Sequence, residues 1–272
     1  MNQNLNLEEI RLDPISHIHR DNNPQFIASL ARGFELLRCF SAEKQVLGNQ
    51  ELAQLTGLPK PTIARITYTL VTLGYLKQLP DSSKYMLDIG VLALGYAALS
   101  NIVIRNLAHP FMQEMSLQVQ APVALATRDR LNMLYLDVIQ TNSMMRRQIG
   151  STLSLYSSAM GRACLAATPE TERQILMTAL EKQHPKNWDE IHFGLQKAFQ
   201  DYEQHGYCIS LGEWKKDINS VAVPLLNSKH GLFVFNCGAP NFQLSAERIE
   251  KEIGPMLKFM VNNIHEALLD ID

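Results

Sequence analysis

The segment from Asn49 to Leu87 constrains the fold of this chain more than any other part of the sequence. Its apolar spacing predicts a short helix, a turn at Gly57, a second helix that begins at Lys60-Pro61, and then two short strands. Gly57 suits the left-handed residue that ends a helix. Pro61 suits a first helical turn, because the amide hydrogen that proline lacks would have no partner there. We expect Asn49 to cap the first helix. This order of elements is a winged helix-turn-helix, which usually places its second helix in the major groove of DNA.

The second helix, Pro61 to Leu73, has an apolar and a polar face. The residues predicted to face the core are Ile63, Ile66, Leu70 and Leu73. The predicted contacts to double-stranded DNA are Lys60, Pro61, Thr62, Arg65, Tyr68 and Thr69, with Lys77 and Lys84 of the hairpin. Arg65 is the best candidate for a guanine contact, because a guanidinium can donate to both O6 and N7. Helix pairs also serve as packing or dimerisation modules, but the hairpin adds little to a core and favours DNA binding.

Charge and length limit the kind of DNA-binding protein this chain can be. The 272 residues are 46% hydrophobic, which is enough for two cores rather than one, and the formal net charge is -2. A reading module needs only a local excess of positive charge. From Phe26 to Asp88 there are seven Lys and Arg residues against five Asp and Glu residues. We therefore expect weak binding by one module and affinity that depends on dimerisation.

The remaining composition predicts an intracellular protein without an export signal. Residues 1–25 are polar and lack the basic start and apolar stretch of a secretory signal, so we expect a flexible arm and a cytoplasmic location. The longest apolar run, Gly90 to Ile104, is interrupted by polar residues and is too short to cross a membrane. The four cysteines are widely spaced and are expected to be reduced thiols: Cys39, Cys164, Cys208 and Cys237.

Two helices flank the module in the sequence. A helix from Leu30 to Phe40 has apolar residues at helical spacing (Leu30, Phe34 and Leu37) and is expected to support the helix pair. The segment from Leu87 to Ser100 reads as a helix that is apolar on nearly all sides, so it must be buried on several of them. Packing against its twin in a homodimer explains this most simply, and burial within its own chain is the alternative.

The rest of the chain predicts a second domain of mixed helices and strands. The expected strands are Val123–Thr127, Met133–Ile139, Met145–Ile149, Tyr207–Leu211, Val221–Leu226 and Leu232–Cys237. The expected helices are Leu107–Val119, Ser158–Ala167, Thr171–Leu180, Asp189–His205 and Ser245–Leu269. The chain is thus predicted to be α+β, with a mostly antiparallel sheet flanked by helices. We divide it into an arm (1–25), a winged helix (26–88), a linker and dimerisation helix (89–104) and an effector-binding domain (105–272).

Six short segments in order resemble the IclR-type bacterial transcriptional regulators. They are Ser29–Gly33, Glu51–Pro59, Leu73–Tyr75, Ala159–Ala163, Gly206-Tyr207 and Ser220–Pro224. The resemblance covers the chain from about Phe26 onward. It implies a winged-helix DNA reader, a linker helix, and a C-terminal effector domain related to profilin- and GAF-like folds. It also implies homodimers, which often pair into tetramers on DNA. The long arm and the segment from Phe26 to Phe40 resemble most the subgroup that regulates aromatic-acid catabolism.

The resemblance also implies a pocket for a small effector between the sheet and the small-residue helix. Carried over by position, its lining would be Met145, Arg147, Leu153, Leu155, Ala159, Met160, Ser210, Ser220, Phe235 and Cys237. Relatives that bind very small carboxylates have an acidic residue in place of Ser210 and a serine in place of Phe235. We therefore expect a larger, partly apolar organic acid. Arg146 or Arg147 could pair with its carboxylate, although both arginines could instead be solvated.

An enzymatic role is disfavoured. Asp201, His205 and Cys208 lie close in sequence, but Cys208 follows the glycine that ends a helix, which is unfavourable spacing for a thiol nucleophile and its base. The sequence contains no glycine-rich phosphate loop, nucleophile elbow or two-histidine zinc motif. We expect no catalytic residues, cofactor or metal. The alternative function is a metabolite-binding protein whose winged helix makes only protein contacts.

Overall fold

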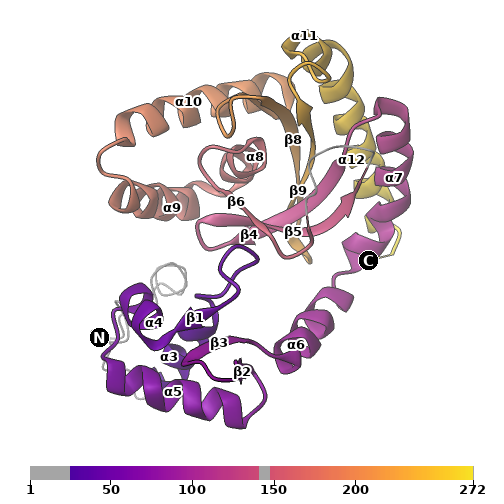
Figure 1. The fold of residues 1–272 in the computed structure, drawn as a ribbon. Coiled ribbons are helices and arrows are strands. Elements are labelled where there is room, and N and C mark those ends of the chain that lie inside the picture. Colours follow the sequence, from indigo (N-terminus) through magenta and orange to yellow (C-terminus); the bar gives the residue numbers. More distant parts are fainter. Residues whose placement is uncertain (1–24, 141–147, 272) are drawn as a thin grey trace. The chain divides into compact units, whose positions relative to one another are not determined.

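The chain divides into two compact units, with the boundary between Asn101 and Ile102 (Figure 1). The computed structural model describes residues 25–140 and 148–271. Within these residues no single helix is long and apolar enough to cross a membrane. Each unit has a core of its own, so each is described separately.

The first unit is a winged helix-turn-helix followed by one further helix. Its elements are α3 (Ala28–Leu37), β1 (Leu47–Gly48), α4 (Asn49–Thr56), α5 (Lys60–Thr72), β2 (Leu76–Gln78), β3 (Lys84–Leu87) and α6 (Ile89–Ser100). The three strands form an antiparallel sheet in the order β1-β3-β2, in which β1 joins the expected hairpin. Leu36, Leu52, Ile63 and Leu76 are fully or almost fully buried and form the centre of the core.

Local signals place the turn of the helix pair where the sequence predicts it. Gly57 has the left-handed backbone angle φ of 68°, and its amide donates to the Ala53 carbonyl at 2.9 Å, which ends α4. The start of α4 differs from the prediction. The Gly48 amide donates to the Glu51 carboxylate at 2.7 Å, whereas Asn49 is the first helical residue and its Oδ1 has no hydrogen-bond partner among the described residues. The Glu51 side chain therefore caps the helix by accepting from the Gly48 amide, and the predicted Asn49 cap was wrong.

The buried stripe of α5 differs from the expected one at its end. Ile63, Thr67 and Leu70 are buried, whereas Leu73 is 62% exposed. Helix α5 ends at Thr72, so Leu73 follows the last turn and is not held against the core. The Thr67 hydroxyl donates to the Ile63 and Ala64 carbonyls, so its burial leaves no unpaired donor.

The apolar stripe predicted for the first helix is mostly at the surface. Leu30 is 55% exposed and Phe34 is 53% exposed, while Glu35 and Leu36 on the other side of α3 are buried. Helix α6 is less buried than α3, because none of its twelve residues is buried. The alternative that this apolar helix is covered by its own chain therefore finds no support in the described residues.

The second unit is a six-stranded antiparallel sheet with helices on both faces. Its elements are α7 (Val103–Val119), β4 (Val123–Asp129), β5 (Asn132–Ile139), β6 (Thr152–Ser154), α8 (Ala159–Ala167), α9 (Glu170–Gln183), α10 (Trp188–His205), β7 (Cys208–Leu211), β8 (Ile218–Asn227), β9 (Gly231–Pro240), α11 (Ala246–Arg248), a π-helical turn (Ile249–Ile253) and α12 (Gly254–Leu269). The strand order is β6-β5-β4-β9-β8-β7. The predicted α+β class with a mostly antiparallel sheet is confirmed. Among the described residues the strand that follows β5 is β6. Of the expected strand Met145–Ile149, Ile149 lies in a turn, and 145–147 are outside the described residues.

Contacts across the sheet define its two faces. The His109 ring in α7 lies 2.7 Å from the Asp137 carboxylate of β5, so Asp137 points to the face that α7 and α12 cover. The Cys208 thiol of β7 donates to the Ala198 carbonyl of α10 at 3.2 Å, so Cys208 points to the opposite face, which α8 and α10 cover. Figure 1 shows the two helical layers on either side of the strands.

Candidate nucleic-acid and effector interfaces

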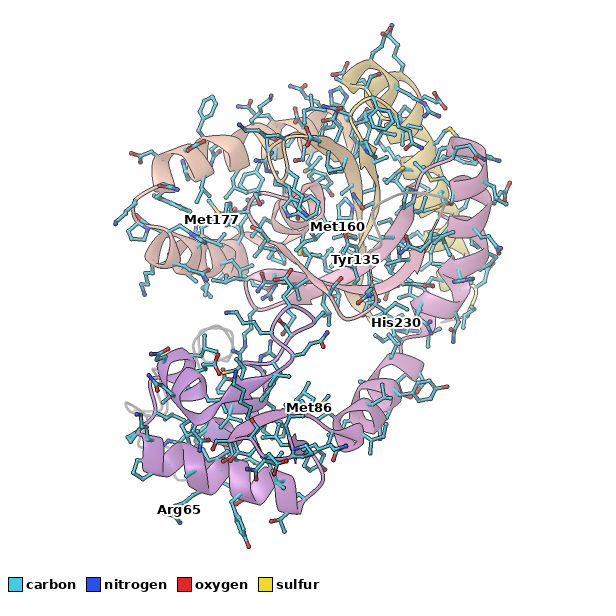
Figure 2. All side chains as sticks on the ribbon, viewed as in Figure 1. Arg65, Met86, Tyr135, Met160, Met177 and His230 are labelled. Atoms are coloured by element: carbon cyan, nitrogen blue, oxygen red, sulfur yellow. The ribbon has the colours of Figure 1, made fainter. Side chains whose placement is uncertain are left out.

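The polar face of α5 is at the surface, as a DNA-reading helix requires. Thr62 is half-buried, and the other predicted contacts on this helix are exposed: Lys60, Pro61, Arg65, Tyr68 and Thr69. Figure 2 shows Arg65 pointing away from the body of the unit. The Thr69 hydroxyl donates to the Arg65 carbonyl at 2.9 Å, so it must leave this bond before it can donate to a phosphate.

The hairpin presents its two lysines on one face. Lys77 lies opposite Met86, and Lys84 lies two residues before Met86 on β3. Paired and alternate residues share a face of a sheet, so both ammonium groups project from the same side. Tyr85, on the other face, is in the core. The wing therefore carries its positive charge on its outer side.

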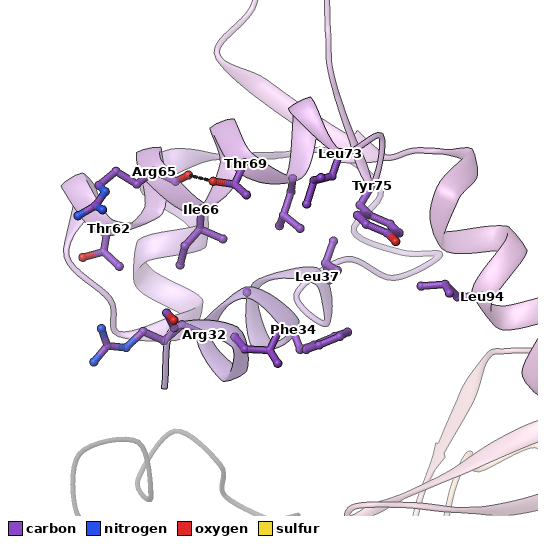
Figure 3. A pocket seen from close by; sticks show the side chains of 14 residues that line it. Arg32, Phe34, Leu37, Thr62, Arg65, Ile66, Thr69, Leu73, Tyr75 and Leu94 are labelled. Carbon is purple, nitrogen blue, oxygen red and sulfur yellow. Dashed lines mark hydrogen bonds between the residues drawn. The ribbon is translucent and has the colours of Figure 1, made fainter. Parts of the chain in front are cut away.

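A groove of about 660 Å³ runs between α3 and α5 and joins a cationic end to an apolar end. Arg32 of α3 lies with Thr62 and Arg65 at one end (Figure 3). The Arg32 Nε is buried and has no hydrogen-bond partner among the described residues. Arg32 is absent from the predicted DNA contacts, because only the packing of α3 across α5 brings it beside Arg65.

Most of the predicted effector residues gather around α8. Leu153, Leu155, Ala159 and Met160 are buried. Helix α8 packs closely on the strand β6 side, since a Cβ on Gly161 would lie 2.1 Å from the Leu155 carbonyl oxygen. Met160 lies in the interior of this unit (Figure 2).

The two predicted serines point to the same face of the sheet as Cys208. Ser210 is buried, and its hydroxyl donates to the Ser157 carbonyl, just before α8, at 3.4 Å. Ser220 lies directly opposite Ser210 in the next strand, so it shares the α8 face. Met145, Arg146 and Arg147 lie outside the described residues.

Phe235 and Cys237 point away from α8, so they cannot line a pocket between α8 and the sheet. Phe235 pairs with Leu125, and Leu125 pairs with Asp137, which bonds to His109 of α7. All of these residues share the face that α7 and α12 cover. The predicted placement of Phe235 and Cys237 was wrong by one residue, and one residue is enough to change the face in a strand.

Asn236 and Gly238 replace them on the α8 face. Asn236 pairs with Ala222, and Gly238 pairs with Ser220. Asn236 is only 4% exposed, and its Oδ1 has no hydrogen-bond partner among the described residues, while its Nδ2 donates to the Val221 carbonyl at 3.3 Å. A buried acceptor without a partner is costly and is typical of a position that a ligand or water satisfies. The signal in the sequence was a single asparagine inside an apolar strand.

Of the residues considered for catalysis, the cysteine lies in the core and the histidine ring packs on a tyrosine. Cys208 is fully buried and donates to Ala198, and this burial raises the pKa of its thiol. Burial also raises the pKa of Cys164, to about 12. The His205 ring stacks on Tyr207 rather than facing a thiol. Among the described residues no group of three or more His, Cys, Asp or Glu side chains could hold a metal ion.

Most of the chain is similar to known transcriptional regulators. The profile of the IclR helix-turn-helix domain matches residues 29–80, and that of the bacterial transcriptional regulator IclR C-terminal domain matches residues 96–265. The HTH-type transcriptional regulator TsaQ1/TsaQ2 of Comamonas testosteroni is 34% identical over 92% of this chain and 91% of its own length. The crystal structure of an IclR family transcriptional regulator from Brucella abortus has 54% identity and a TM-score of 0.87, and the match covers 91% of this chain and 95% of that one.

An IclR homologue from Microbacterium hydrocarbonoxydans, crystallised with 4-hydroxybenzoate, shares the fold. Its TM-score is 0.68 at 19% identity, and the match covers 89% of this chain and 99% of that one. Together, the two matched profiles span both units of the structure. The chain belongs to the IclR family of bacterial transcriptional regulators.

Proposed function

We propose that this regulator reads DNA with the N-terminal half of α5 and holds it with the wing. Lys60, Thr62 and Arg65 approach base edges in the major groove. Tyr68, Thr69, Lys77 and Lys84 contact phosphates, which sets the register of the helix. The observation that supports this best is the exposed polar face of α5 beside a wing whose lysines share one side.

The regulator acts as a homodimer that binds a pseudo-palindromic operator. Two copies joined through α6 place two recognition helices on successive major-groove faces of one duplex. The support is α6 itself, which is apolar and has no buried residue in the single chain. Pairing of two dimers into a tetramer is the next level of assembly. Because the ligand is chromosomal DNA, we assign the protein to the cytoplasm.

A small organic acid bound on the α8 face controls operator occupancy or activity. We assign DNA reading to residues 26–88, coupling to 89–104 and effector binding to 105–272. The effector site includes Leu153, Leu155, Ala159, Met160, Ser210 and Ser220, with Asn236 and Gly238 in place of Phe235 and Cys237, and Met145 and Arg147 as predicted lining. The apolar members of this set favour a partly apolar acid.

The buried Oδ1 of Asn236, which has no partner among the described residues, limits which chemical groups the effector can carry. This oxygen needs a donor, which a hydroxyl group on the acid supplies. The homologue crystallised with 4-hydroxybenzoate is an example of this fold with a hydroxylated aromatic acid. We therefore place hydroxylated aromatic acids first among the candidates.

The test is a gel-shift assay on the DNA upstream of the gene, with and without acids selected by thermal shift. An acid at about one hundred times its dissociation constant should add about 2.7 kcal/mol of stability. We expect specific binding that changes several-fold to about a hundredfold with the effector. Stabilisation by an acid with no specific DNA binding would favour the alternative of a metabolite-binding protein that uses its winged helix for protein contacts.

A further inference from the structure

A second cavity, of about 440 Å³, lies at the edge of the six-stranded sheet, beside β7. Strand β7 is the last strand in the sheet order, and no described strand pairs with its outer side. Helix α10 supplies Lys197, Asp201 and His205 to the cavity wall from one helix face, and Glu250 of the π-helical turn stands on another side. The volume lies in the usual range for a small-molecule site.

This cavity is separate from the proposed effector site. None of the described residues that we assign to the effector site lines it. The side chain of Ser210 turns toward α8, where its hydroxyl donates to the Ser157 carbonyl, whereas the cavity is lined by Ile209 and Leu211 on either side of Ser210. The cavity therefore opens along the edge of β7 and not between α8 and the sheet.

The backbone of β7 offers hydrogen-bonding groups to this cavity. The Gly212 amide donates to the Ile218 carbonyl at 3.0 Å, so Gly212 faces β8. Because bonded residues alternate along an antiparallel pair, Leu211 and Ile209 turn their amides and carbonyls away from β8. These outward groups have no hydrogen-bond partner among the described residues. The Ile209 carbonyl and the Leu211 amide thus place an acceptor and a donor side by side at the cavity.

Charged side chains of both signs stand around these backbone groups. Lys197 and Asp201 form no hydrogen bond or ion pair with any other described residue. Burial raises the pKa of the Asp201 carboxyl by more than the nearby Lys197 and His205 lower it, so its negative charge is incompletely balanced. One cation and one carboxylate on the same helix face are therefore available to a bound molecule.

Two further residues of the cavity are nine-tenths buried. Arg162 of α8 is 7% exposed, and its Nη1 donates to the Glu213 carboxylate at 2.5 Å, so these two charges largely neutralise each other. Tyr207 is 5% exposed and lines the cavity, but its hydroxyl has no hydrogen-bond partner among the described residues. A buried hydroxyl without a partner is typical of a position that a ligand or water satisfies.

We propose that this cavity binds a free α-amino acid. The carboxylate of the amino acid accepts from the Leu211 amide and pairs with Lys197, and its ammonium group donates to the Ile209 carbonyl and pairs with Asp201. A molecule with only one of the two charges would leave one side of this arrangement unmatched.

The length of β7 favours a single amino acid over an extended peptide. The strand has four residues, and Gly212, with a left-handed φ of 72°, turns the chain directly after it. Only one outward carbonyl is followed by an outward amide within β7, which matches the one ammonium and one carboxylate of an amino acid. Ala198, Ile209 and Leu211 add apolar surface, which favours an amino acid with an apolar side chain.

Thermal shift and calorimetry on the full chain test the proposal. Each common L-α-amino acid is added separately, and at least one with an apolar side chain should raise the unfolding temperature. Its N-acetyl derivative, which lacks the ammonium group, and its amide, which lacks the carboxylate, should not. Stabilisation by none of the amino acids, or equal stabilisation by the N-acetyl derivative, would overturn the proposal.

Variants of α10 locate the binding in this cavity. Asp201→Asn and Lys197→Gln should each weaken the affinity for that amino acid about tenfold or more. The matched control is Glu203→Gln, at an exposed residue of the same helix outside the cavity, and it should bind like the wild type. Wild-type affinity in both cavity variants would place the amino acid elsewhere and overturn the site.

The same proteins separate this proposal from the proposed function. Asp201→Asn should still be stabilised by an organic acid that binds on the α8 face and should still bind operator DNA. Failure of the wild-type protein to bind operator DNA would overturn the proposed function, whereas the amino-acid site is judged by calorimetry alone.

Discussion

Phe235 and Asn236 are neighbours in β9 but serve opposite sides of the sheet. Phe235 shares its face with Asp137, which bonds to α7, and Asn236 shares its face with Ala124 and Ala222, toward α8. The apolar neighbour belongs to the core beneath α7 and α12. Asn236, whose buried Oδ1 has no hydrogen-bond partner in the part of the chain that the structure describes, belongs to the side on which we place the effector.

Replacing Asn236 by a residue without a side-chain acceptor should impair effector binding and leave the fold intact. Asn236→Leu removes a buried acceptor that has no partner among the described residues, but it also removes the Nδ2 donor to the Val221 carbonyl. These two effects oppose each other, so the unfolding temperature without ligand should change little. The lost hydrogen bond should weaken binding of a hydroxylated acid such as 4-hydroxybenzoate by about 1–3 kcal/mol. Calorimetry measures this loss, and DNA binding without effector is the control. Unchanged affinity for every acid that binds the wild type would remove Asn236 from the site.

Arg65 and Lys84 should differ in how their loss depends on the operator sequence. Arg65→Ala should cost about 1–3 kcal/mol and relax the preference at one base pair, whereas Lys84→Ala should weaken binding to all sequences alike. Fluorescence anisotropy across single-base operator variants separates the two effects. Equal profiles for the two variants would contradict the assignment of Arg65 to a base and Lys84 to a phosphate.

Arg32 should act as an additional phosphate contact. Its guanidinium lies at the cationic end of the groove with Arg65, and no described residue is a hydrogen-bond partner of its Nε. Arg32→Ala should weaken binding to every operator variant and reduce the slope of log affinity against log salt by about one. Titrations at several salt concentrations measure this slope. A slope equal to that of the wild type would show that Arg32 does not touch the DNA backbone.

Helix α8 should not tolerate a larger residue at Gly161. A Cβ there would lie 2.1 Å from the Leu155 carbonyl oxygen, so the backbone would have to move. Gly161→Ala should lower the free energy of unfolding by about 1–3 kcal/mol or more. Gly33→Ala in α3 is the matched control, since nothing lies within 4 Å of its added carbon, and it should raise stability by up to about 1 kcal/mol. Denaturant unfolding compares the two, and equal stabilities would contradict the close packing of α8.

The four cysteines should differ in reactivity. Burial raises the pKa of three of these thiols, that of Cys164 to about 12, but Cys39 is partly exposed whereas Cys164 and Cys208 are buried. At pH 8 almost none of these buried thiols is ionised, and the thiolate is the reactive form. Iodoacetamide should therefore label Cys39 first, as mass spectrometry of peptides would show. Cys208→Ser should keep full DNA binding, and rapid labelling of Cys208 would reopen a chemical role for it.

Local sequence signals were sufficient to predict the structure wherever the backbone preference of a single residue decides it. Gly57 ends α4 because glycine adopts the left-handed conformation without strain, and Pro61 falls in the first turn of α5. Alternation and helical spacing predicted most strands and helices of the second unit, and the ordered short segments indicated the family. These signals depend on neighbours within a few residues, so they are readable without the fold.

Only the tertiary structure decided which surface each apolar or polar residue meets. The sheet is covered by helices on both faces, so β9 is apolar on both, and hydrophobicity could not tell which of Phe235 and Asn236 turns to α8. Spacing likewise marks Phe34 and Leu73 as residues to be buried, but both are more than half exposed in the single chain. Arg32 came beside Arg65 only because α3 crosses α5. The sequence by itself determined the elements, their order and the family, and the packing of distant segments determined the faces, because a side chain's partners lie far away along the chain.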